Sequence, residues 1–152
     1  MNKIALFPGS FSPFSLGHQS VVEIALPLFD KIVIGIGSNC DKDEFFSIRK
    51  RKEWIKKVYK NNNKVTIDKY EGLTIDYCKK IGAKYIIRGL RGSHDFRYER
   101  NIAHVNKDLD KDIETIFIMP PANLSHISST IIRDIIENGG DASQFLPKEI
   151  NI

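Results

Sequence analysis

Glycine, proline, hydroxyl residues and one imidazole gather in the segment Phe-Pro-Gly-Ser-Phe-Ser-Pro-Phe-Ser-Leu-Gly-His at residues 7–18. It follows an apolar run at residues 4–7 and precedes an amphipathic stretch at residues 19–29, which predicts a loop between a strand and a helix. At a helix start the backbone N–H groups lack intrahelical partners, and the helix dipole adds positive potential. Such a loop suits phosphate groups, because Gly9 and Gly17 allow close backbone approach and His18 can donate a hydrogen bond to phosphoryl oxygens.

The loop lacks the patterns of the two common glycine-rich phosphate loops. No Lys-Ser or Lys-Thr follows a glycine, as in a P-loop, and there is no G-x-G-x-x-G. Instead Ser15-Leu16-Gly17-His18 resembles the T/H-x-G-H signature of nucleotidyltransferases related to class I aminoacyl-tRNA synthetases. The alternative is a structural strand-to-helix turn with a surface histidine. The preceding Pro-Gly-Ser-Phe and the position directly after the first strand favour phosphate binding.

Two guanidinium groups follow another expected strand, in the run Arg88-Gly89-Leu90-Arg91. Arginine forks match phosphate oxygens bidentately. Lys42 follows the second expected strand and adds a further positive charge. In open α/β sheets ligands bind beyond the carboxyl ends of the strands, so we expect these cations and the loop at residues 7–18 at the same edge.

A hydroxyl-rich segment precedes the last expected helix, with the sequence Leu124-Ser125-His126-Ile127-Ser128-Ser129-Thr130. Its hydroxyls and the free N–H groups of the helix start predict a second phosphate cradle. Ser128 or Ser129 is also a candidate N-cap, the commoner role for serine before an apolar helix. Both roles can coexist at one helix terminus.

Other kinds of catalytic site are not indicated. Cys40 and Cys78 are too far apart for a C-x-x-C motif, and no His, Cys, Asp or Glu cluster has zinc-like spacing, so we expect no protein metal ligands. No serine has the G-x-S-x-G surroundings of a hydrolase nucleophile. A site rich in hydrogen-bond donors and poor in nucleophiles favours phosphoryl or nucleotidyl transfer, in which the enzyme positions and neutralises charge.

Short apolar runs alternate along the chain with helix-length amphipathic stretches. We expect strands at residues 3–7, 31–37, 64–70, 84–88 and 114–119, and helices at residues 19–29, 48–60, 75–81, 96–109 and 129–137. Runs such as Ile32-Val33-Ile34-Gly35-Ile36 are nearly continuous in apolar residues, which suits strands buried on both faces. The sequence therefore predicts an α/β fold: a single doubly wound, Rossmann-like domain at residues 1–152, with a five-stranded parallel sheet and helices on both faces.

Local signals mark several helix ends. Ser47 and Thr74 are expected N-caps, and Gly82 is expected just past the end of its helix. Pro27 removes a helical hydrogen bond, so it should kink or shorten the first helix near its end.

The composition is that of an ordinary globular protein. The 152 residues are 41% hydrophobic and 28% charged, enough for one domain. No apolar stretch approaches the ~20 residues of a membrane helix. The chain opens without a basic region followed by an apolar core, so no signal peptide is expected. Two cysteines in a chain of this size indicate reduced thiols, and we expect a cytoplasmic protein with no membrane partner.

The net charge of +4 is unevenly placed. A single acid, Glu53, accompanies a run of bases at Arg49, Lys50, Arg51, Lys52, Lys56, Lys57, Lys60 and Lys64. Such a helix could hold nucleic acid through phosphate contacts. The interpretation we favour is a solvated helix face with Ile48, Trp54, Ile55 and Val58 turned to the core, because no aromatic residues interleave with the bases as stacking platforms.

Taken together, these motifs closely resemble the phosphopantetheine adenylyltransferase family, over residues 3–147. The matching segments are Pro-Gly-Ser-Phe, Ser-Leu-Gly-His, Ile-Arg-Gly-Leu-Arg, Asp95-Phe96-Arg97-Tyr98-Glu99, Ile127-Ser128-Ser129-Thr130 and Gln144-Phe145-Leu146-Pro147. In this order and spacing the set is specific, although each segment alone is short.

The resemblance implies transfer of AMP from ATP to 4′-phosphopantetheine, with Mg²⁺, giving dephospho-coenzyme A and pyrophosphate. It implies catalytic roles for His18, Lys42 and Arg88, and it places the acceptor against Ser10, Lys42, Thr74 and Arg88. The ATP site it implies comprises Ser10, Phe11, His18, Gly89, Leu90, Arg91, Glu99, Leu124, Ser125, His126, Ile127, Ser128, Ser129 and Thr130. Family members commonly assemble as hexamers, so a homo-oligomer is implied as well.

The chain departs from the family pattern in the first loop. Serine replaces the usual threonine at positions 10 and 15, which keeps the hydroxyl, and we expect little change. Ser12 replaces an aspartate, so a carboxylate is missing between Phe11 and Pro13. Two other functions remain open: a small nucleotidyltransferase with another nucleotide or acceptor, and a nucleic-acid-binding module that uses the basic helix.

Overall fold

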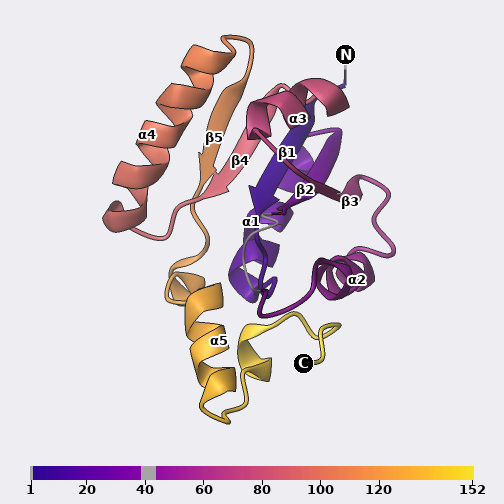
Figure 1. Cartoon of the computed structure of the whole chain (residues 1–152), viewed down its shortest axis with the longest axis vertical. Helices are drawn as coiled ribbons and strands as arrows, with labels where there is room; N and C mark the ends of the chain where they lie inside the picture. The colour runs from indigo at the N-terminus through magenta and orange to yellow at the C-terminus, as the bar shows by residue number, and fades with distance from the viewer. Residues whose placement is uncertain (1, 39–43) are drawn as a thin grey trace.

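A computed structural model describes residues 2–38 and 44–152, so the expected site residue Lys42 lies outside the described residues. The fold is a five-stranded sheet in the order β3-β2-β1-β4-β5, with every pair of neighbours parallel. The strands are β1 (Ile4–Gly9), β2 (Lys31–Gly37), β3 (Val65–Tyr70), β4 (Tyr85–Gly89) and β5 (Glu114–Ile118). The predicted five-stranded parallel sheet is confirmed (Figure 1).

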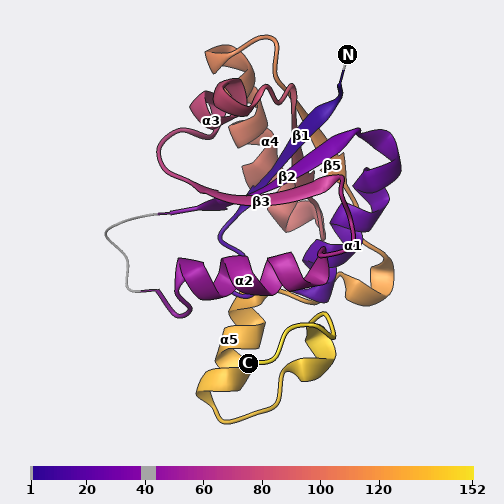
Figure 2. The same ribbon diagram turned by 90° about the vertical axis from the view of Figure 1, so that its right-hand side faces the viewer.

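Helices cover both faces of this sheet, as expected. They are α1 (Leu16–Ala25), α2 (Ile48–Val58), α3 (Thr74–Ile81), α4 (Ser93–Leu109) and α5 (Ser129–Glu137), with short 3₁₀ turns at Leu26–Leu28, Ala122–Leu124 and Ser143–Phe145. In Figure 2, α1 and α2 lie on one side of the sheet and α3 lies on the other. Helix α5 lies beyond the carboxyl ends of the strands (Figure 1), which brings it to the edge where ligands bind in this class of fold.

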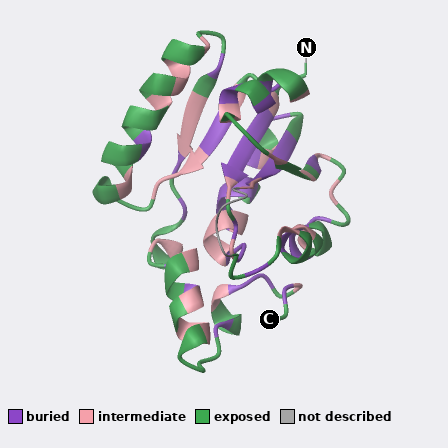
Figure 3. Cartoon of the chain, viewed as in Figure 1, coloured by how far each residue is buried: buried purple, intermediate pink, exposed green. Residues whose placement is uncertain are grey.

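The apolar strands are buried on both faces because alternate side chains point to opposite sides. Phe7 and Ile34 belong to a core that also contains residues of α1, α2 and α5. Their neighbours Leu6 and Val33 belong to a second core on the α3 side, with Cys78. Burial of both sets leaves the central strands covered throughout (Figure 3), which explains why their sequences carry no polar alternation.

The strand order places a topological switch between β1 and β4. The chain builds outward from β1 through β2 to β3, then crosses back to pair β4 with β1 at Ala5↔Tyr85 and Leu6↔Ile86. The loop after β1 and the Arg88–Arg91 run after β4 are therefore neighbours in space. Crevices at such a switch point are the ligand-binding places of open α/β sheets.

The helix ends agree with most of the local signals. Helix α1 stops at Ala25 and Pro27 lies in the following 3₁₀ turn, as predicted for a proline at that place. Ser47 caps α2 by accepting from the Lys50 N–H, and Gly82 ends α3 with a left-handed φ of 72°. The expected cap at Thr74 is wrong, because residue 73 occupies that position and the Thr74 hydroxyl bonds to the Tyr70 hydroxyl at 3.0 Å instead.

Two helices begin three residues earlier than the sequence pattern predicts. Helix α1 starts at Leu16 rather than residue 19, so His18 lies in its first turn. Helix α4 starts at Ser93 rather than residue 96. Among the described residues no helix is long and apolar enough to span a bilayer.

Candidate active site

A cavity of about 270 Å³ opens at the carboxyl edge of the sheet, between the loop after β1, the end of β4 and the start of α5. A second hollow of about 240 Å³ lies beside it, toward Tyr70, Thr74 and α4. Both hollows are lined by Pro8, Gly9, Arg88 and Glu99. Two neighbouring spaces that share a guanidinium group are suited to two phosphorylated ligands that react with one another.

Most of the expected site residues meet at these two spaces. The first cavity is lined by Ser10, Phe11, His18, Arg88, Gly89, Arg91, Glu99, Ile127, Ser128, Ser129 and Thr130, and the second by Thr74 and Arg88. Leu90, Leu124, Ser125 and His126 line neither space. Segments far apart in the sequence are therefore brought together by the strand order.

His18 is locked into one orientation by the start of its own helix. The Ser15 backbone N–H donates to His18 Nδ1 at 3.0 Å, and the Ser15 hydroxyl accepts from the His18 N–H at 3.4 Å, which completes a capping box. Because Nδ1 accepts this hydrogen bond, the proton of the neutral ring belongs on Nε2. Burial, with the nearby charges of Arg91 and Arg88, lowers the pKa of His18 to about 3, so the ring is a neutral donor at pH 7.

Aromatic rings support the histidine from behind. Phe14 stacks on the His18 ring with centroids 5.4 Å apart, and Phe11 meets it edge-on at 5.0 Å. The whole Phe11 residue is only 2% exposed, so its main contribution here is to pack against the His18 ring. Phe11 has a positive φ of 48°, a strained conformation for a bulky residue. A Cβ on Gly9 would lie 2.9 Å from the Phe11 ring, so this glycine makes room for the ring and not only for a ligand.

Arg88 is held by a carboxylate and a loop carbonyl. Its Nε and Nη2 donate to the two Glu99 carboxylate oxygens at 2.8 and 2.7 Å, and its Nη1 donates to the Pro8 carbonyl at 2.7 Å. Glu99 is the one residue of α4 that is buried. The carboxylate expected at the ATP site therefore orients Arg88, and the bidentate geometry fixes the guanidinium plane between the two hollows.

Arg91 joins the β4 end to the segment before α5. It donates to Asp95 at 3.2 Å and to the Ile127 carbonyl at 3.2 Å. Both of its partners come from the walls of the first cavity. The second guanidinium of the Arg88–Arg91 run thus closes the side of the cavity while it adds positive charge.

Two serines at the start of α5, Ser128 and Ser129, use their hydroxyls for hydrogen bonds within the protein. Ser128 is the N-cap, since its hydroxyl accepts from the Ile131 N–H at 3.2 Å. The Ser129 hydroxyl donates to the Pro13 carbonyl at 2.8 Å, which fastens α5 to the loop after β1. Of the two serines that the sequence offers as N-cap of α5, Ser128 is the one that occupies the cap position.

Two arginines that sequence reasoning did not assign to the site hold the loop after β1. Arg51 of α2 donates to the Ser10 carbonyl at 2.6 Å, and Arg133 of α5 donates to the Ser12 carbonyl at 2.5 Å. The interpretation of Arg51 as part of a solvated face is wrong, because the residue is buried. Its spacing of three and four from the core residues Trp54 and Ile55 was the available signal, since such residues share one helix face.

No three His, Cys, Asp or Glu side chains gather to hold a metal ion in the part of the chain that the structure describes. The two acids that line the first cavity, Asp95 and Glu99, both accept hydrogen bonds from arginines. Both carboxylates are therefore engaged with guanidinium groups.

Comparisons with known proteins identify the class of the fold. Residues 6–135 match the family model described as Cytidylyltransferase-like. A bifunctional NMN adenylyltransferase/ADP ribose pyrophosphatase from Francisella tularensis has the same fold, with a TM-score of 0.74 and 21% identity over 96% of this chain and 45% of that longer chain. Fold and site together define a nucleotidyltransferase of the cytidylyltransferase-like class.

Relatives with higher identity narrow the family. A phosphopantetheine adenylyltransferase from Flavobacterium psychrophilum is 50% identical over 97% of both chains. The enzyme of the same name from Cytophaga hutchinsonii is 45% identical over 99% of this chain and 100% of its own. The chain belongs to the phosphopantetheine adenylyltransferase family.

Proposed function

We propose that this protein transfers AMP from ATP to 4′-phosphopantetheine and releases dephospho-coenzyme A and pyrophosphate. The observation that carries the proposal is the pair of adjoining hollows that share Arg88. In this arrangement ATP occupies the cavity beneath His18 and the start of α5. The acceptor occupies the hollow toward Thr74, with its phosphate at Arg88.

The chemistry is a direct in-line displacement. An oxygen of the acceptor phosphate attacks the α-phosphorus of ATP, and the bond from that phosphorus to the bridging oxygen of the pyrophosphate group breaks. The Ser10 hydroxyl lines the first cavity, but the ring of His18 carries its proton on Nε2 and uses Nδ1 for the Ser15 N–H, so it cannot act as a base for that serine. The enzyme instead positions the two phosphates and offsets their charge.

His18 is the donor that acts on charge developing at the α-phosphoryl group. Its neutral Nε2–H is fixed by the capping box, so little reorganisation accompanies the reaction. Arg88 holds the acceptor phosphate throughout, and Lys42, which lies outside the described residues, is a further cation that the family resemblance assigns to the acceptor.

We propose that Mg²⁺ enters with the phosphates of ATP, where it would neutralise part of their charge. Mg²⁺ commonly keeps several waters and binds through substrate phosphates rather than an all-protein cage. This route suits a cavity whose two acids are bonded to arginines. Removal of Mg²⁺ with a chelator should abolish turnover while leaving the fold of the protein unchanged by circular dichroism.

We propose that this enzyme is cytoplasmic and that it forms a homo-oligomer. The family resemblance implies that the oligomer is a hexamer. Helix α4 leaves apolar side chains exposed along its length, among them Tyr98 at 68%, Val105 at 56% and Leu109 at 53%. Rows of exposed apolar side chains on one helix indicate a protein interface. Light scattering after size exclusion should give a mass well above the 17.4 kDa of one chain.

Pyrophosphate release tests the proposed function. Wild-type protein should release pyrophosphate only when ATP, Mg²⁺ and 4′-phosphopantetheine are all present. Replacing ATP by CTP, or the acceptor by other phosphorylated alcohols, separates this function from that of another small nucleotidyltransferase. Isolation of a stable adenylyl-protein after incubation with ATP alone would contradict direct transfer. Salt-dependent binding of an oligonucleotide without turnover would favour the nucleic-acid-binding alternative.

A further inference from the structure

Helix α2 carries one buried arginine among exposed basic residues. Arg51 is 4% exposed, whereas the side chain of Arg49, two residues earlier, is 89% exposed. Arg51 lies on the helix face that Trp54 and Ile55 turn to the core. A cation in this position loses its hydration, and burial lowers the pKa of the Arg51 guanidinium while Glu44 partly offsets the shift. Such a residue is costly to bury unless its donors are satisfied.

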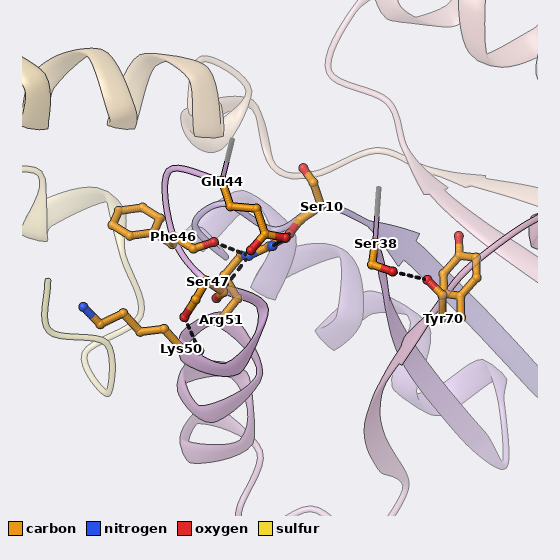
Figure 4. A network of polar contacts seen from close by, with 8 residues as sticks. All are labelled: Ser10, Ser38, Glu44, Phe46, Ser47, Lys50, Arg51 and Tyr70. Carbon is orange, nitrogen blue, oxygen red and sulfur yellow. Dashed lines mark hydrogen bonds and ion pairs between the residues drawn. The ribbon is translucent and has the colours of Figure 1, made fainter. Parts of the chain in front are cut away.

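The Arg51 donors connect three parts of the chain (Figure 4). Nε donates to the Phe46 carbonyl at 3.0 Å, and Nη2 donates to the Glu44 carboxylate at 3.0 Å. The shortest bond runs from Nη1 to the Ser10 carbonyl at 2.6 Å, across 41 positions of sequence. The guanidinium therefore ties the start of α2 to the loop after β1.

Ser10 is held by its backbone and leaves its side chain for a ligand. The Ser10 hydroxyl points away from Arg51 (Figure 4), and it has no hydrogen bond to the described residues. Carbonyls on either side are fixed by other donors, because Arg88 bonds to Pro8 and Arg133 bonds to Ser12. Arg51 thus supplies the middle contact of three that set the path of this loop.

We propose that Arg51 is a positioning residue for adenylyl transfer, which acts by holding Ser10 so that its hydroxyl meets the reacting phosphates. The inference rests on the proposed function, since Ser10 is the residue expected at both substrates. Lysine at position 51 keeps the charge but loses the planar fork that reaches Ser10 and Glu44 together. Methionine keeps much of the volume but removes the charge and all the donors, so the Ser10 and Phe46 carbonyls lose this partner and the partly exposed Glu44 carboxylate must be hydrated.

The first measurement compares Arg51→Lys and Arg51→Met with the matched surface variants Arg49→Lys and Arg49→Met. Thermal unfolding and circular dichroism select the variants that fold. We expect a loss of about 10-fold or more in kcat/KM for each folded Arg51 variant, because small displacements of positioning groups are costly in rate. The Arg49 variants should stay within about 2-fold of wild type, since they alter an exposed pair with Glu53.

A double-mutant cycle with Ser10→Ala separates positioning from a general effect on stability. If Arg51 acts through Ser10, its substitution should cost less than about 3-fold in the Ser10→Ala background, because the group that it positions is already gone. The proposal would be overturned if the Arg51 and Ser10 substitutions reduced kcat/KM by independent factors that multiply in the double mutant. Folded Arg51 variants with unchanged kcat and KM would overturn it as well. Failure of both Arg51 variants to fold would do the same, because the residue would then be structural. An inactive wild type would instead reject the proposed function itself.

Discussion

Two helix starts face the same cavity and use their polar groups in different ways. At the start of α1, the capping box engages only one nitrogen of His18, so the Nε2–H remains to act on a ligand. At the start of α5, the Ser128 and Ser129 hydroxyls are bonded to the Ile131 N–H and the Pro13 carbonyl. Similar polar residues at two helix starts can therefore leave a donor free for a ligand in one case and hold the scaffold together in the other.

The largest effect expected from this comparison is at His18. In the proposed mechanism His18 is a donor used mainly in the transition state, so His18→Ala should lower kcat by about 10²–10³, with less effect on the KM values. Steady-state kinetics in both substrates measures this. His18→Gln is the matched control for the helix cap, because glutamine at this position can keep the capping box. A His18→Ala variant with reduced ATP affinity and an intact kcat would show that the transition-state role is wrong.

Arg88 combines both uses of a polar side chain. Its guanidinium is bonded to Glu99 and Pro8, as in a scaffold contact, yet it also faces both hollows. Arg88→Ala should raise the KM for 4′-phosphopantetheine at least as much as it lowers kcat, because in the proposed arrangement this residue binds the acceptor phosphate before and during transfer. Full kinetics with each substrate varied in turn measures both constants. An effect confined to the KM for ATP would place Arg88 at the other substrate and contradict this division.

The pH dependence of stability tests whether His18 is neutral in the folded protein. Its folded pKa of about 3 lies below the ordinary 6.5, so the unfolded chain binds the extra proton between these values. The free energy of unfolding attributable to His18 should therefore be complete above pH 6.5 and fall as the pH is lowered toward 3, by at most about 1.4 kcal/mol per pH unit. Chemical denaturation of wild type and His18→Gln at several pH values gives the difference. Equal slopes, or a His18 NMR titration near 6.5, would contradict it.

The start of α5 should respond to substitution in stability more than in catalysis. Ser129→Ala removes the bond to the Pro13 carbonyl and should cost about 1 kcal/mol of unfolding free energy. Because that hydroxyl is already engaged, kcat should change by less than about 3-fold. Ser125→Ala is the matched control, since its hydroxyl bonds only within the local turn, to the Ala122 carbonyl. A large loss of kcat in Ser129→Ala at unchanged stability would mean that this hydroxyl binds the ligand. The starts of α1 and α5 would then both supply polar groups to the ligand, contrary to the difference described above.

The sheet was predictable from the sequence because its signal is local and repeated. Strands buried on both faces need nearly continuous apolar runs, as at Lys31–Gly37, and the expected bounds for that strand match the structure. The gathering of the loops at one edge followed from parallel strand direction alone.

The pairings of side chains within the site were harder to predict from the sequence, because they depend on tertiary geometry. No residue near Glu99 in the sequence indicates that its carboxylate orients Arg88. Thr74 is a residue type that often caps helices, but its hydroxyl bonds to the Tyr70 hydroxyl instead. Arg51 is an intermediate case, since its spacing from Trp54 marks the buried helix face although its charge indicates the surface. Charge and periodicity conflicted there, and periodicity was the better guide.

The smallest expected effect concerns Ser12, where the family carries aspartate. Its carbonyl accepts from Arg133 of α5 at 2.5 Å, so the position already lies beside a cation. Ser12→Asp introduces a carboxylate that Arg133 can offset, and kcat/KM for ATP should stay within about 3-fold of wild type. The neutral variant Ser12→Asn has nearly the same shape and separates charge from size.

Kinetics of the two Ser12 variants would sharpen the comparison between the helix starts. If Ser12→Asp loses activity and Ser12→Asn does not, the added charge repels the ATP phosphates, and Arg133 contributes nothing beyond its bond to the loop. If both variants lose ATP binding while the fold is intact, the Ser12 side chain itself serves the nucleotide. Activity retained in both would mean that the loop depends on the carbonyl contact with Arg133, and that α5 organises the α1 start through the backbone rather than through a carboxylate at position 12.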